Sequence, residues 1–169
     1  MKQLLLKLLE LLIGKLTRGS VTEQAPSGHL AAYKLAKKYR GLKELPGNKH
    51  EKQIIEFFED VGHSWVKDDE TFWCAAFVGA MLERSGVPST KKLNARSYLE
   101  WGQAVKLEDL KEGDIVVFWR GSKSSWEGHV AFFVGFDPAG DLLVLGGNQS
   151  NMVNVQKYSK SRFLSGRRG

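Results

Sequence analysis

The chain has 169 residues, 42% of them hydrophobic and 26% charged, which is enough for one domain with a real core and argues against wholesale disorder. The net charge of +6 favours polyanionic partners such as nucleic acid, anionic lipid or a bacterial wall, but the scattered basic residues form no long nucleic-acid-binding arm. The single cysteine, Cys74, excludes an internal disulfide and any site with several zinc-bound thiolates.

The sequence of residues 1–19 predicts an amphipathic helix. Lysine and glutamate interrupt this leucine-rich segment, so its uninterrupted apolar stretches are too short to span a membrane. The same charges make it a poor secretory signal. We expect it to dock on the domain or on a partner chain, with peripheral membrane attachment as the alternative. Residues 20–28 are polar and contain Gly and Pro, which indicates a linker, and residues 29–169 form one domain. No localisation follows from these features.

The domain begins with helical patterns and ends with extended ones. Apolar residues recur at helical spacing over 29–40, 50–61 and from about Trp73 to Arg84, with a short helix near 95–101. After Gly113 the pattern predicts strands over 114–119, 129–136 and 141–146. Helices first and strands second predict an α+β fold with an antiparallel sheet.

Cys74 is expected in the first turn of the third helix. Unpaired backbone N–H groups and the helix dipole at such a position lower the pKa of a thiol, so a reactive cysteine competes with the alternative of a small buried residue. A thiol nucleophile needs a base, and His129 opens an apolar strand directly after Gly128. Of the other histidines, His29 and His50 lie at predicted helix starts and His63 in a loop, where a solvated or capping residue is the simpler interpretation. A structural histidine at 129 remains the alternative.

A third polar group usually holds such a base in place. The strand that contains His129 turns at Asp137 to Gly140, and pairing across that turn places His129 opposite residue 148 or 149. These are Asn148 and Gln149, both of which carry a side-chain oxygen. Two preceding glycines can bulge the strand and change which of the two faces the ring. The alternative is that Asn148 and Gln149 are only polar residues of a turn and take no part in the chemistry.

Five segments, in the order in which they occur, resemble the CHAP and NlpC-type peptidoglycan hydrolases of bacteria and phages. They are WCAAFVGAMLERSG, NARSYLEWG, LKEGDIVVFWRG, GHVAFFVGF and LGGNQSNMV. The resemblance covers roughly residues 32–168 and implies a papain-like fold with N-terminal helices packed on the antiparallel sheet. By position it implies Cys74 as nucleophile, His129 as base and Asn148 as the orienting group. NlpC-type enzymes often have a histidine as third residue, so an asparagine is nearer the CHAP pattern.

The resemblance implies a cysteine peptidase or amidase that cleaves an amide bond of bacterial peptidoglycan, in the stem peptide or between muramic acid and alanine. It implies no cofactor. A phage lysis system or a specialised export route would deliver such a protein to the wall. A non-catalytic wall-binding module on the same fold and a papain-like acyltransferase are the alternatives.

Four residues are candidates for substrate binding: Trp73 and Gln149 beside the expected catalytic groups, Trp126 in the loop before His129, and Arg96 at the start of a short helix. Arg96 can pair with a substrate carboxylate, although bonding to backbone or to a neighbouring acid is the simpler interpretation. No two histidines have metal-ligand spacing, so no metal site is expected.

Overall fold

The computed structural model describes residues 27–169. The helix expected over residues 1–19 and nearly all of the linker lie outside the described residues, so those two predictions remain untested. Within the described part no helix is long and apolar enough to cross a membrane.

The three α-helices of the described residues precede the strands along the chain, as the sequence predicts. The α-helices are α2 (Gly28–Ala36), α3 (Lys52–Asp60) and α4 (Cys74–Arg84), and the 3-10 helices are η1 (Lys37–Tyr39), η2 (Ala95–Glu100), η3 (Leu107–Asp109) and η4 (Lys160–Arg162). The strands are β1 (Gln103–Val105), β2 (Ile115–Trp119), β3 (Gly128–Phe136), β4 (Leu142–Gly146), β5 (Asn154–Tyr158) and β6 (Phe163–Arg168).

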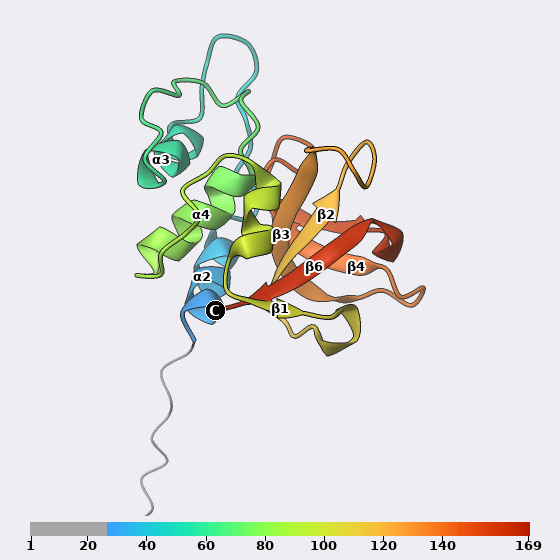
Figure 1. Ribbon diagram of the computed structural model, residues 1–169. Helices are drawn as coiled ribbons and strands as arrows, with labels where there is room; N and C mark the ends of the chain where they lie inside the picture. The colour runs from blue at the N-terminus through green and yellow to red at the C-terminus, as the bar shows by residue number, and fades with distance from the viewer. Residues whose placement is uncertain (1–26) are drawn as a thin grey trace, which may run out of the picture.

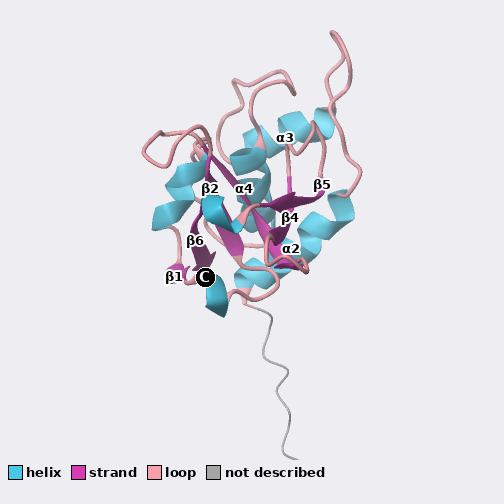
Figure 2. Cartoon of the chain, turned by 90° about the vertical axis from the view of Figure 1, so that its right-hand side faces the viewer, coloured by secondary structure: helices cyan, strands magenta, loops and turns pink. Residues whose placement is uncertain are grey.

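The strands form one six-stranded sheet in the order β1-β6-β2-β3-β4-β5, and every neighbouring pair is antiparallel. Helices α2 and α4 lie on one side of this sheet, with α3 beyond them (Figure 1). The view turned by 90° shows the strands at the centre with helices around them (Figure 2). The predicted α+β fold with an antiparallel sheet is therefore confirmed.

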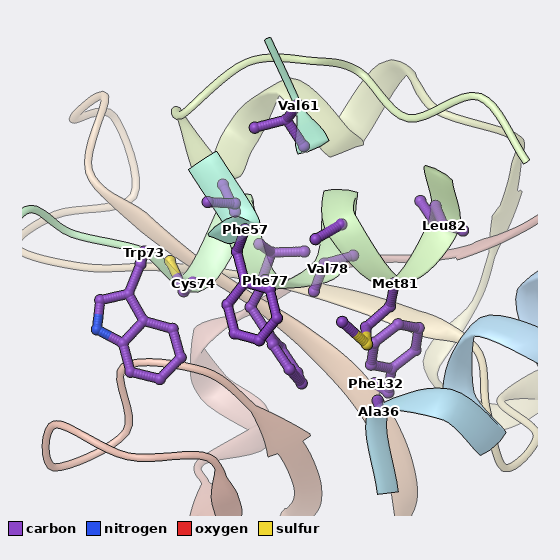
Figure 3. Packing of buried hydrophobic residues seen from close by; sticks show 14 of the residues in the cluster. Ala36, Phe57, Val61, Trp73, Cys74, Phe77, Val78, Met81, Leu82 and Phe132 are labelled. Carbon is purple, nitrogen blue, oxygen red and sulfur yellow. The ribbon is translucent and has the colours of Figure 1, made fainter. Parts of the chain in front are cut away.

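Helix α4 is the central helix of the core. Every residue from Cys74 to Leu82 is buried, as expected for a helix that is apolar all round and enclosed by neighbours. It packs against α2, α3 and β3, and its Phe77 meets Phe57 of α3 with the two rings 5.4 Å apart. Figure 3 shows this cluster, with Cys74 and Trp73 at the N-terminal end of α4.

Strand β3 separates two hydrophobic clusters because its side chains alternate between the two faces of the sheet. Val130 and Phe132 belong to the cluster on the helix side, whereas Ala131 and Phe133 belong to a second cluster. His129 precedes this alternation and takes the position two residues before Ala131. It lies at the beginning of β3, and its imidazole stacks on Tyr158, which packs against the second cluster.

Candidate active site

Cys74 is the first residue of α4, which confirms the predicted position in the first turn. Only 8% of its surface is exposed. Burial raises the pKa of the Cys74 thiol, while the backbone N–H of Val130 and the charge of Arg120 act in the opposite direction. The expectation of a lowered thiol pKa is therefore wrong for the protein at rest, because desolvation outweighs the helix N-terminus. The resting cysteine is a neutral thiol.

His129 is completely buried at the beginning of β3, where it pairs across the ladder with Phe118 of β2. The ring of Tyr158, from β5, stacks on the imidazole with centroids 4.8 Å apart and an interplanar angle of 2°. Burial, with a further contribution from the charge of Arg120, lowers the pKa of His129 to about 3. His129 therefore has a neutral imidazole that stacks against an aromatic neighbour.

Gln149 determines which nitrogen of His129 carries the proton. Its Nε2 donates to the carbonyl oxygens of Asn154, at 2.7 Å, and Val144, at 3.3 Å, so its Oε1 is left to face the ring. That Oε1 lies 2.9 Å from His129 Nε2. An amide oxygen only accepts, so Nε2 must be the N–H and Nδ1 must carry the free lone pair. The second nitrogen is thereby prepared to act as a base.

The structure places Gln149, and not Asn148, against His129. Phe132 pairs with Leu145, and the same register continued along the strand would bring Asn148 opposite His129. Strand β4 ends at Gly146, however, and Asn148 takes the left-handed conformation with φ 53°. This turn of the backbone sends the next side chain inward, so Gln149 is 1% exposed. Asn148 lines the cleft described below without the expected bond to the imidazole.

The glycine before this turn lets the loop approach α4. A Cβ at Gly147 would lie 2.5 Å from the indole of Trp73 and 2.7 Å from Cβ of Phe77. No L side chain fits there without displacing one of the two residues. The loop that carries Gln149 therefore rests on the residue that precedes Cys74.

Cys74 and His129 line the same cleft, which has a volume of about 110 Å³. Its other lining residues are Phe72, Leu93, Asn94, Ala95, Arg120, Trp126, Glu127, Gly128 and Asn148. Two aromatic side chains at this cleft are largely exposed, Phe72 at 73% and Trp126 at 72%. Trp126 therefore remains a candidate for substrate contact, and Phe72 is a second one that the sequence analysis did not single out.

Three of the four predicted substrate-binding residues have roles within the protein instead, and Gln149, buried against His129, is one of them. Trp73 is fully buried, and its Nε1 donates to Glu44 Oε1 at 2.7 Å, so its indole belongs to the core. Arg96 donates to the backbone carbonyl oxygens of Ser122, Lys123 and Glu127. These bonds engage all of its guanidinium nitrogens, and they fasten the loop between β2 and β3.

The cation that does line the cleft is Arg120, which the sequence analysis did not select. Its Nη2 lies 3.4 Å from His129 Nδ1 and 3.3 Å from the hydroxyl of Tyr158. A usable signal was present in the sequence, because Arg120 directly follows an apolar strand that pairs with the strand of His129. In the part of the chain described, no group of three His, Cys, Asp or Glu side chains is arranged to hold a metal ion.

Comparison with solved structures defines the fold class as the papain-like fold of NlpC/P60 proteins. The chain is similar to the NlpC1 protein of Trichomonas vaginalis, with 18% identity, a TM-score of 0.54, and coverage of 87% of this chain and 46% of that one. It is also similar to a lipoprotein-like member of the NLP/P60 family from Staphylococcus aureus, with 15% identity, a TM-score of 0.52, and coverage of 94% and 47%.

A third similar structure is the P60 domain of an antigen from M. avium subspecies paratuberculosis, with 15% identity, a TM-score of 0.50, and coverage of 83% of this chain and 93% of that domain. The chain thus spans about half the length of the first two structures and nearly all of an isolated P60 domain. No protein-family model matches the sequence, and no curated protein matches it.

Proposed function

We propose that this chain is a cysteine-dependent hydrolase that cleaves an amide bond of bacterial peptidoglycan, in the stem peptide or between muramic acid and alanine. The observation that carries the proposal is the contact between Gln149 and His129, because it leaves the lone pair of Nδ1 available while His129 lines the same cleft as Cys74. The wall as substrate is supported by the resemblance of five sequence segments to CHAP and NlpC-type hydrolases and by the net charge of +6.

In the proposed reaction the Cys74 proton passes to Nδ1 of His129 while the sulfur attacks the substrate. The sulfur attacks the amide carbonyl carbon, and the resulting oxyanion is stabilised by the backbone N–H of Cys74 at the start of α4. His129 then returns its proton to the leaving nitrogen as the C–N bond breaks, which leaves a thioester. Water, deprotonated by the same imidazole, hydrolyses the thioester and regenerates the thiol. Gln149 holds the ring throughout these steps.

Both reacting groups are neutral at rest, because burial raises the pKa of Cys74 and lowers that of His129. Proton transfer and attack on the carbonyl are therefore coupled, and no thiolate–imidazolium pair precedes the substrate. The same neutrality favours one competing function, a wall-binding module that keeps the fold without performing the reaction. The two functions differ in whether new chain ends form.

The test is incubation of the full-length protein with purified peptidoglycan, followed by mass analysis of the soluble fragments. We expect new amine and carboxyl termini that identify one cleaved bond, and their loss in Cys74→Ala. A protein that pellets with the wall and releases no fragment would support the wall-binding module. Fragments released equally by wild type and a folded Cys74→Ala variant would refute the cysteine mechanism.

A further inference from the structure

Arg120 is a half-buried cation at the reacting pair. It follows β2 directly and points its Nη2 at His129 Nδ1 and at the Tyr158 hydroxyl, at 3.4 and 3.3 Å. Neither group carries a negative charge in the resting protein. None of the ion pairs among residues 27–169 includes Arg120.

Other arginines of the domain are engaged differently. Arg84 pairs with Asp60 and Arg168 with the buried Asp114, each at 2.6 Å. Arg96 bonds to three backbone carbonyls of the loop. Arg120 has only a long contact to a ring nitrogen and one to a phenol, both weaker than a charge-assisted pair with a carboxylate. Its charge therefore remains available to an anion that enters the cleft.

We propose that Arg120 binds a free carboxylate of the substrate that lies close to the scissile amide, and that this carboxylate is required for efficient cleavage. The inference rests on the proposed function and specifies the substrate class of that same cleft. Arg120, Cys74 and His129 all line a cleft of about 110 Å³, so a carboxylate bound by Arg120 must belong to the cleaved residue or to its immediate neighbour. A guanidinium fork matches the two oxygens of a carboxylate.

Binding of the carboxylate also has a consequence for the base. The positive charge of Arg120 opposes protonation of His129 and contributes to its lowered pKa. A carboxylate paired with Arg120 offsets that charge, and so makes Nδ1 a better acceptor for the Cys74 proton. The substrate group that is recognised thus also activates the imidazole, and its removal should lower kcat as well as raise KM.

The experiment uses stem peptides in matched pairs that differ only by a carboxylate or a carboxamide, changed at one position at a time. With wild-type protein we expect one replacement to lower kcat/KM by about 10- to 100-fold, as for loss of one charge-assisted pair. Arg120→Gln should cleave the acid and the amide at the same rate, and Arg120→Lys should recover part of the preference for the acid. Lys123→Gln, in the same loop, removes an exposed positive charge and should keep the full preference.

A second measurement does not depend on turnover. Inactive Cys74→Ala protein should bind the acid peptide about tenfold or more tightly than the amide peptide, and Cys74→Ala with Arg120→Gln should bind both equally. Equal handling of the two peptides by wild type, or a preference that survives in folded Arg120→Gln, would overturn the assignment. Absence of cleavage with an intact binding preference would instead count against the hydrolase and leave the carboxylate site supported.

Discussion

The Oε1 atom of Gln149 accepts a hydrogen bond from Nε2 of His129 at 2.9 Å, and this contact joins the loop after β4 to the beginning of strand β3. Gln149 is itself held by bonds from its Nε2 to Val144 and Asn154. Gln149 is therefore anchored to strands β4 and β5 as well as to His129.

Gln149→Ala should lower kcat strongly, whereas Asn148→Ala should lower it little. Removal of Gln149 leaves the buried Nε2–H of His129 without an acceptor, which should also cost about 1–3 kcal/mol of unfolding free energy. Kinetics on peptidoglycan and urea denaturation of both variants provide the measurement. Asn148→Gly is the control for the left-handed backbone, since glycine adopts φ 53° without strain. A larger loss in Asn148→Ala than in Gln149→Ala would return the orienting role to Asn148.

Cys74→Ala and His129→Ala should each abolish wall hydrolysis, and the double variant should lose no more than either one, because nucleophile and base act as a unit. Cys74→Ala should cost only about 1 kcal/mol of stability, as a small change at a buried position. Thermal unfolding confirms that the variants are folded before release of wall fragments is measured. Residual activity of folded Cys74→Ala close to wild type would exclude the thiol mechanism.

Alkylation of Cys74 by iodoacetamide should be slow at neutral pH and accelerate toward alkaline pH, because burial raises the pKa of the thiol. Arg120→Gln removes a charge that lowers this pKa, so its rate profile should move to still higher pH. The alkylation rate is recorded from about pH 6 to about pH 10, a range that includes the pKa of a free thiol, roughly 8.5. Fast labelling of the wild type near neutral pH would instead reveal a thiolate at rest.

The stability of the domain should fall in mild acid because of His129. Its pKa is about 3 when folded, compared with an ordinary value of 6.5, so the unfolded chain takes up a proton that the folded one refuses. Neutral His129 makes its full contribution to the free energy of unfolding above about pH 6.5. That free energy decreases by about 1.4 kcal/mol per pH unit as the pH falls toward about 3. Denaturant unfolding of wild type and His129→Asn at pH values near 7 and 5 measures the difference. Parallel losses in both proteins would contradict the assignment.

Arg96→Ala should lower activity on every substrate alike. Its three bonds to the loop between β2 and β3 hold one wall of the cleft, and their loss should reduce stability by about 1–3 kcal/mol. The ratio of rates for acid and amide peptides should stay that of the wild type, in contrast to Arg120→Gln. A selective loss of the acid preference in Arg96→Ala would restore the role in substrate binding that the sequence suggested.

The sequence was sufficient to predict the fold and the positions of Cys74 and His129, because each lies where a periodic pattern begins. Helix α4 and strand β3 are long apolar segments, and such segments have clear periodicity. The last two strands were not predicted, since β5 and β6 are short and polar with sequences NVQKY and FLSGRR. Their pairing with β4 and β2 depends on tertiary context that a local pattern does not contain.

The environment of the two reacting groups was harder to predict than their positions. Counting across the hairpin limits the partner of His129 to two residues, but the choice between them depends on the left-handed backbone at Asn148. The pKa of Cys74 depends on how far α4 is enclosed, and a helix N-terminus in a sequence does not reveal burial. Trp73 was a candidate because it adjoins Cys74 along the chain, whereas its indole N–H bonds to Glu44. Arg96 bonds to backbone, as the simpler interpretation of the sequence had it.

The contact between Gly147 and the indole of Trp73 makes these two positions interdependent over evolutionary time. A full-sized indole at 73 and a methyl group at 147 exclude one another, since the added carbon would lie 2.5 Å from the ring. A larger residue at 147 also requires the loop to move away from Phe77, whose Cβ would lie 2.7 Å from the added carbon. The two positions adjoin Cys74 and the Gln149 loop respectively, so a substitution at either would displace both halves of the site, although neither residue lines the cleft.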